Sequence, residues 1–422
     1  MLKKPFETAL LCLTAALALV TDGWADGEVI TLPHAERLAL AADPGVNAME
    51  SRQLALDELA EAAVQLPDPL LKMGVMSLPT DTFQLGQEPM TQVLVGLVQR
   101  FPRGETRSLR SAQLREQGLA LDAFAADLAL RARLAVREEY LEVLKQRHLA
   151  DINREAEAVF SDLEDITGDY YATGRVQQQD VLRAALERSR VRERATGIAE
   201  EEDRARARLA TWIGEAAWQP LEPQWPLLPT TRPQQDLLDG LTHHPRLRAL
   251  HQQVVAADRG VALAEQAYKP EFAVDLTYGG RGGTDMDGSE RSDLLSVMVT
   301  MDLPLFTAGR QDRDLAARVA ESSAAAYDRD DVYRRLQAEL QLQARTLGRQ
   351  RERLALFQNE LLPEASFNAE ATYSAYQAAV ENLTTLMRAR LTEFDLRLEY
   401  ARLQAEVLKT QARLLYLQGE TP

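Results

Sequence analysis

The sequence predicts a mainly α-helical protein with a small β part, in which one order of elements occurs twice. Three observations predict this fold class: a composition typical of long helices, paired motifs about 205 positions apart, and four short stretches of alternating hydrophobicity. The 422 residues are rich in Ala, Leu, Arg, Glu and Gln, and only 6% are aromatic. Such a composition favours long helices over a compact enzyme core.

Charge and cysteine content exclude several classes of function. The formal net charge of −16 argues against nucleic-acid binding, which needs a basic surface. A single cysteine, Cys12, excludes disulfides and Cys-based zinc sites, and five histidines leave little for a metal site. No G-x-S-x-G, H-E-x-x-H or P-loop pattern occurs. We therefore expect no enzymatic activity, no cofactor and no metal.

Residues 1–25 have the pattern of a secretory signal peptide. Lys3 and Lys4 precede an apolar run from Ala9 to Val20, and Gly23-Trp24-Ala25 places small residues before a cleavage site. The run is too short to cross a bilayer as a helix. Leu11 stands before Cys12 where a lipoprotein signal has a small residue, so we expect an exported chain without a cysteine.

The rest of the chain is predicted to be a duplication. The paired positions are Asp43-Pro44 with His244-Pro245, Pro67 with Pro270, Gly104 with Gly309, and Tyr171 with Tyr376. The offset stays constant over about 80 residues after the two glycines, which chance similarity between helices would not produce. We expect a first repeat over 26–217, a second over 235–422, and a proline-rich extended connector over 218–234.

Each repeat is predicted to contain three helices. A first helix is expected over 35–65 and 236–268, a long helix over 104–169 and 309–373, and a last helix ending near Ile213 and Leu417. Leucines seven residues apart mark both long helices: Leu114, Leu121 and Leu128, then Leu340, Leu347, Leu354 and Leu361. At 1.5 Å per residue each long helix spans about 100 Å, so two shorter helices could stack end to end beside it. An ordinary coiled-coil dimer would explain the leucines but not the duplication.

Between the first and long helices, each repeat is predicted to form a β-hairpin, at about 70–102 and about 271–304. In the second hairpin one face of each strand is apolar: Phe272, Val274, Leu276 and Tyr278, then Leu295, Val297, Val299 and Met301. The first hairpin repeats this alternation more weakly, with Leu71, Met73 and Val75, then Val93, Val95 and Leu97. Tilted strands of this length are long enough to cross a bilayer.

A soluble hairpin packed on a core is the alternative, but the chain has no further strands to complete a sandwich. Four strands cannot close a barrel, because about eight are needed. Unpaired strand edges cannot face lipid. A membrane barrel would therefore need strands from two or three copies.

This pattern resembles the outer-membrane efflux (TolC-like) family over nearly all of the mature chain. The resemblance rests on the duplicated order, on the Tyr171-x-x-Gly174 segment, and on two strand-to-helix turns that contain Pro102, Gly104, Pro304 and Gly309. It implies a homotrimer with a 12-stranded β-barrel in outer-membrane lipid and a helical tunnel in the periplasm. It also implies two partners, a periplasmic adaptor and an inner-membrane efflux pump. The GETRSLR segment after the first turn is slightly more similar to heavy-metal efflux members, and drug efflux stays open.

The resemblance also implies roles for residues near the two predicted tip turns, at about 170–176 and 374–381. Residues expected at the periplasmic tip, where an adaptor would dock, are Tyr171, Gly174, Tyr376 and Ala379. Residues expected at the entrance or gate are Asp180, Arg183, Thr384, Thr385 and Arg388. The family has a ring of acids at this entrance, but this chain has Thr385 and Arg388 there. We therefore expect ion pairs of Asp180 with Arg183 or Arg388, with solvated surface charges as the alternative.

A periplasmic adaptor is the nearest rival function, because adaptors are also exported and also contain a coiled-coil hairpin. They carry one hairpin within a β-rich domain, whereas this sequence predicts two repeats, each with its own long helix.

Overall fold

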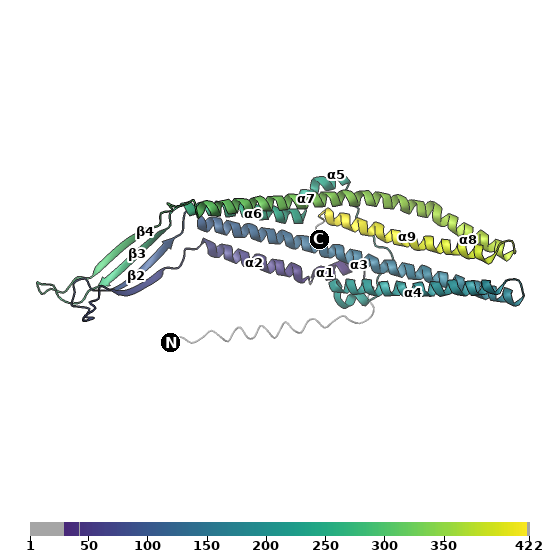
Figure 1. Cartoon of the computed structure of the whole chain (residues 1–422), viewed down its shortest axis with the longest axis horizontal. Helices are drawn as coiled ribbons and strands as arrows, with labels where there is room; N and C mark the ends of the chain where they lie inside the picture. The colour runs from purple at the N-terminus through teal and green to yellow at the C-terminus, as the bar shows by residue number, and fades with distance from the viewer. Residues whose placement is uncertain (1–28, 42, 420–422) are drawn as a thin grey trace.

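The computed structural model describes residues 29–41 and 43–419 and shows a long rod. A β-sheet lies at one end, and two helical hairpins end at the other (Figure 1). The predicted signal peptide, including Cys12, lies outside the described residues. Within the described ranges, no helix combines the length and the apolar character that a membrane span requires.

The predicted duplication is confirmed, because the same order of elements occurs twice. The first half contains α1 (Leu32–Ala41), α2 (Pro44–Val64), β1 (Leu70–Met76), β2 (Gln92–Phe101), α3 (Thr106–Ala172), α4 (Gln178–Ile213) and the 3₁₀ turn η1 (Gly214–Trp218). The second half contains α5 (Gln234–Gly240), η2 (Leu241–His243), α6 (Pro245–Glu265), η3 (Gln266–Tyr268), β3 (Phe272–Gly280), β4 (Leu294–Met301), α7 (Gln311–Leu356), the π turn η4 (Phe357–Leu361), α8 (Leu362–Gln377) and α9 (Leu383–Leu417).

The prediction of a single first helix in each half, over 35–65 and 236–268, was wrong. Each of these helices is interrupted before a proline, at Pro44 and at Pro245, which is the first residue of a new helix. A proline at this position needs no hydrogen-bond partner, but it cannot continue a helix from the preceding turn. The residue before each proline caps the new helix: Asp43 Oδ1 accepts from the Gly45 N–H at 2.7 Å, and His244 Nδ1 accepts from the Arg246 N–H at 3.2 Å.

The two long helices differ from each other. In the first half, α3 is continuous over 67 residues. In the second half, the predicted single helix over 309–373 is divided into α7 and α8 by the π turn η4. Pro363 follows that turn and has no N–H to donate, so the hydrogen-bond ladder must change its spacing there.

The shorter helices stack end to end along the long ones, as expected. Both α2 and α4 pack on α3, while α6 and α9 pack on α7 (Figure 1). The helix α3 also contacts α6 and α9, and these contacts join the two halves. One link is polar: Glu142 of α3 accepts hydrogen bonds from Lys145 and from Lys409 of α9. Burial would raise the pKa of Glu142, yet these hydrogen bonds lower it to about 2.

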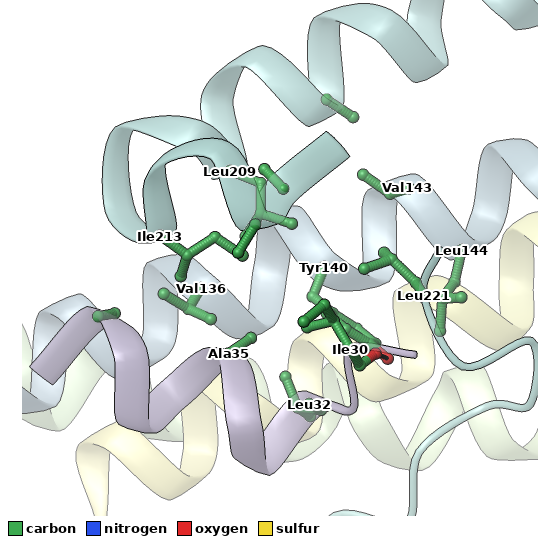
Figure 2. Close-up of a cluster of buried hydrophobic side chains, with 14 residues drawn as sticks. Ile30, Leu32, Ala35, Val136, Tyr140, Val143, Leu144, Leu209, Ile213 and Leu221 are labelled. Carbon is green, nitrogen blue, oxygen red and sulfur yellow. Dashed lines mark hydrogen bonds between the residues drawn. The ribbon is translucent and has the colours of Figure 1, made fainter. Parts of the chain in front are cut away.

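A buried cluster in the middle of the rod holds the first described residues and the connector against α3 (Figure 2). Ile30 and Leu221 form an isolated parallel bridge, so the connector runs beside the first residues of the described chain. The Tyr140 hydroxyl donates to the Ile30 carbonyl at 2.9 Å, and burial raises the pKa of Tyr140 to about 12. Leu209 and Ile213 of α4 complete the cluster, which joins the first described residues, α3, and the segment from α4 to the connector.

Candidate functional site

The four strands form one antiparallel sheet in the order β1-β2-β3-β4. The two hairpins meet through β2 and β3, where Leu97 pairs with Leu276. Because side chains alternate across a sheet, this register places the apolar positions of both hairpins on one common face. The strands β1 and β4 form the outer edges, and within the described chain neither edge is paired.

The predicted lipid-facing residues lie together on that apolar face. The pairs are Phe272 with Met301, Val274 with Val299, Leu276 with Val297, and Tyr278 with Leu295. Most of these side chains are exposed in the single chain; Val297 is 67% exposed. An apolar face this large and this exposed is rare on a monomeric soluble protein. Contact with lipid stays a prediction.

The opposite face of the sheet is more polar. It carries Lys72, Gly96, Asp275, Thr277 and Ser296, which the register places near one another across the four strands. Lys72 Nζ lies 2.9 Å from Asp275 Oδ2. The sheet therefore has one face suited to an apolar environment and one suited to water.

The two strand-to-helix turns are built differently, although the sequence pairs them. Pro102 and Pro304 follow the ends of β2 and β4, where a missing N–H does not interrupt the ladder. Gly104 has a φ of +43°, and a Cβ there would lie 2.5 Å from Gln266 Oε1. Gly309 has an ordinary φ and open space around it. Only the first turn therefore depends on glycine.

At the other end of the rod, each helical hairpin turns through a residue in the left-handed conformation. Gly174 has a φ of +73° and Ala379 a φ of +56°. The sequence predicted a turn at both residues. A left-handed conformation costs alanine more free energy than glycine, so Ala379 is strained there. Their role in adaptor docking stays a prediction.

The two tip tyrosines are not equivalent, contrary to their alignment in the repeat. Tyr171 is 49% exposed, whereas Tyr376 is only 6% exposed and packs against Tyr170 with ring centroids 5.9 Å apart. Burial raises the pKa of Tyr376. Arg175 lies over the ring of Tyr170 at 5.5 Å. Tyr376 therefore joins the two hairpins from inside, and Tyr171 is the tyrosine that a partner could reach.

The expected ion pairs at the gate do not form within one described chain. Asp180 belongs to a capping box: its carboxylate accepts from the Gln177 N–H at 3.3 Å. Arg183 donates instead to the Thr384 hydroxyl of α9, and Arg388 is exposed. The N–H and hydroxyl of Thr385 both donate to Asn382 Oδ1, at 3.0 and 3.2 Å. The Asp180 carboxylate is satisfied within its own helix. Ion pairs between residues of different copies, and the role of these residues as a gate, stay predictions.

A cleft of about 750 Å³ separates the two hairpin tips. It brings together five of the residues that the sequence singled out: Asp180, Arg183, Tyr376, Ala379 and Thr384. Tyr171, Gly174, Thr385 and Arg388 do not line it. The cleft wall mixes both signs of charge with amide and hydroxyl groups.

Ion pairs that the sequence did not single out lie beyond the gate residues and connect the hairpins. Arg194 of α4 pairs with Asp395 of α9 at 3.1 Å, and Arg397 of α9 pairs with Glu155 of α3 at 2.5 Å. Charged residues are so frequent on these helices that spacing alone could not select these partners. Among the residues described here, no cluster of three metal-binding side chains occurs.

Comparisons with known proteins agree with this geometry. The family model described as outer membrane efflux protein matches residues 239–420, which confirms the resemblance to that family. No curated protein sequence matches the chain. The structure is similar to the outer membrane protein VceC from Vibrio cholerae, with a TM-score of 0.78 at 17% identity over 92% of this chain and 96% of that one. It is also similar to the Campylobacter jejuni CmeC outer membrane channel (TM-score 0.77, 11% identity, 95% and 90% covered). The open Neisseria gonorrhoeae MtrE outer membrane channel has a TM-score of 0.72 at 13% identity, with 92% and 88% covered.

Proposed function

We propose that this chain is the outer-membrane channel of a tripartite efflux system. Three copies would place twelve strands in a barrel through the outer membrane and their helices in a tunnel through the periplasm. A periplasmic adaptor would dock at the helical tips, and an inner-membrane pump would deliver the solute. From the resemblance we expect a heavy-metal ion or a drug as cargo.

The sheet carries this proposal. One of its faces is apolar and exposed across all four strands, and both of its edges are open. In lipid every backbone N–H and C=O must be paired, so β4 of one copy would have to pair with β1 of the next. β1 runs from the helical end toward the loops and β4 runs back, so this pairing would be antiparallel (Figure 1). Three copies give twelve strands, enough to enclose a passage.

The rest of the rod suits a tunnel with a docking end. The helix α3 is 67 residues long, about 100 Å, which would carry the passage far from the membrane. The exposed turn at Gly174 and the cleft between the tips lie at the far end. A periplasmic adaptor, the rival function, would need a β-rich domain, and the described residues contain one sheet of four strands.

Two neighbouring residues of β4 offer a matched test. Val297 lies on the apolar face and Ser296 on the polar face. Val297→Arg would place a cation in lipid at roughly 2–4 kcal/mol per copy, whereas Ser296→Arg would place it in water. We expect Val297→Arg to be lost from the outer-membrane fraction. Ser296→Arg should insert and form channels of lower conductance in planar bilayers.

Fractionation of the wild-type protein is the control. A mature chain recovered in the soluble periplasm without detergent would contradict the channel. Normal insertion of Val297→Arg would show that the apolar face does not contact lipid.

A further inference from the structure

We infer that the Lys72–Asp275 ion pair determines the ion selectivity of the strand end of the channel. The inference rests on the proposed function, because the polar face of the sheet lines an aqueous passage only when copies close a barrel. It concerns a pair of charges that none of the sequence patterns singled out.

The pair bridges two strands that are not neighbours. Lys72 of β1 lies opposite Gly96 of β2, and Gly96 lies opposite Thr277 of β3. The Lys72 side chain crosses β2 and places Nζ 2.9 Å from Asp275 Oδ2. Because Gly96 has no side chain, the Lys72 side chain can cross β2 at that position.

Gly96 also allows Thr277 to hold the carboxylate. A Cβ at Gly96 would lie 2.4 Å from Thr277 Oγ1, so the threonine occupies the space that a side chain would take. Thr277 is 7% exposed, and its hydroxyl donates to Asp275 Oδ1. The Asp275 side chain is 15% exposed, whereas that of Lys72 is 49% exposed. The carboxylate is therefore held in place by two donors, and the ammonium group covers it from the aqueous side.

Few other charges lie on this face. Within the four described strands, the polar face carries one carboxylate, Asp275, and two cations, Lys72 and Arg100. Arg100 lies nearer the helices. Below it, at the base of the sheet, Arg103 pairs with Asp302 and lies 3.9 Å from Glu271. Removing either Lys72 or Asp275 would therefore change the net charge of the middle of the barrel wall.

Three copies would repeat the pair around one level of the passage. Paired charges largely cancel for a passing ion, so the pair itself enriches neither sign. Removing one partner leaves three like charges at the same level, and a narrow passage with low-dielectric walls concentrates their field on permeating ions. The intact pair therefore adds little net charge at this level.

Reversal potentials across planar bilayers under a KCl gradient test the inference. At about 0.1 M salt, where the Debye length is about 10 Å, fixed charges still act across the passage. Lys72→Gln should raise the K⁺/Cl⁻ permeability ratio at least about twofold, and Asp275→Asn should lower it by a similar factor. The double variant Lys72→Gln/Asp275→Asn is the matched control and should return the ratio to the wild-type value. At 1 M salt, where the Debye length is about 3 Å, the differences should fade.

The outcomes separate the inference from the proposed function. Equal permeability ratios in all four proteins would overturn the inference and leave the channel standing. A double variant that departs from the wild type as far as the single variants do would assign the pair to folding of the sheet and overturn selectivity. If the wild-type protein forms no conducting channel, the proposed function fails and the inference fails with it.

Discussion

The two halves of the chain contain the same elements, yet their long helices differ. The first-half helix α3 is unbroken and lies at the centre, in contact with α2, α4, α6 and α9. The second-half helix is interrupted by a π turn before Pro363, and α7 packs mainly on α5, α6 and α9. A change in ladder spacing rotates every later side chain. After the π turn these side chains belong to α8, which packs mainly on α9, whereas α3 packs on both α4 and α9. The comparison indicates that the peripheral long helix tolerates an irregularity that the central one excludes.

The turns differ between the halves in a similar way. At the strand-to-helix turns, the first half needs glycine at Gly104 and the second does not need it at Gly309. At the tips, both halves use a left-handed residue, but the second half has Ala379 where the first has Gly174. The duplication has therefore kept the positions at which the chain turns and has changed the residues that satisfy each turn.

The largest effect is expected from moving the proline into the central helix. Ala158 of α3 corresponds to Pro363 in the repeat and is exposed, so Ala158→Pro changes the backbone without removing a buried contact. Proline within a helix costs about 3 kcal/mol or more, because it removes a hydrogen bond and clashes with the preceding turn. We expect a large fall in the thermal midpoint of the detergent-purified protein. Ala158→Gly, the matched control, should cost about 1 kcal/mol. A wild-type midpoint for Ala158→Pro would show that α3 does not need an unbroken ladder.

A smaller effect should separate the two strand-to-helix glycines. Gly104→Ala forces alanine into a left-handed conformation, at about 1–2 kcal/mol, and also displaces Gln266. Gly309→Ala meets open space with an ordinary φ and should stabilise the protein by about 0.4–1 kcal/mol, because it reduces the entropy of the unfolded chain. Guanidinium unfolding midpoints would measure both changes. Equal losses in the two variants would mean that the turns are equivalent after all.

The smallest effect is expected at the tips. Ala379→Gly should relieve the left-handed strain by about 1 kcal/mol, and Gly174→Ala should introduce it by a similar amount. Because the tips open locally, amide hydrogen exchange of the tip residues would detect these changes better than global unfolding. Exchange should slow in Ala379→Gly and become faster in Gly174→Ala. Faster exchange in Ala379→Gly, or unchanged exchange in both variants, would contradict the strain at Ala379.

Local patterns predicted most of the elements but not all of their ends. The alternation over Phe272–Tyr278 indicated a strand correctly, because side-chain direction follows directly from extended backbone geometry. The prediction of a single helix over 35–65 is wrong, because Asp43 caps a new helix and Pro44 occupies its first turn. At the gate, Asp180 was expected to pair with arginine. Its carboxylate accepts instead from the Gln177 N–H at the start of its own helix, a contact that side-chain charge alone does not reveal.

Local sequence patterns are enough to predict the duplicated order, the long helices, the alternating strands and the left-handed turns at the tips. Each of these follows from interactions between residues close together in the chain. Long-range packing is needed to explain why β2 pairs with β3, why Lys72 reaches Asp275 over Gly96, and why Tyr376 is buried while Tyr171 is exposed. These outcomes depend on residues that are far apart in sequence. Many registers satisfy the local pattern equally well, and packing selects the one in which apolar faces coincide and buried charges find partners.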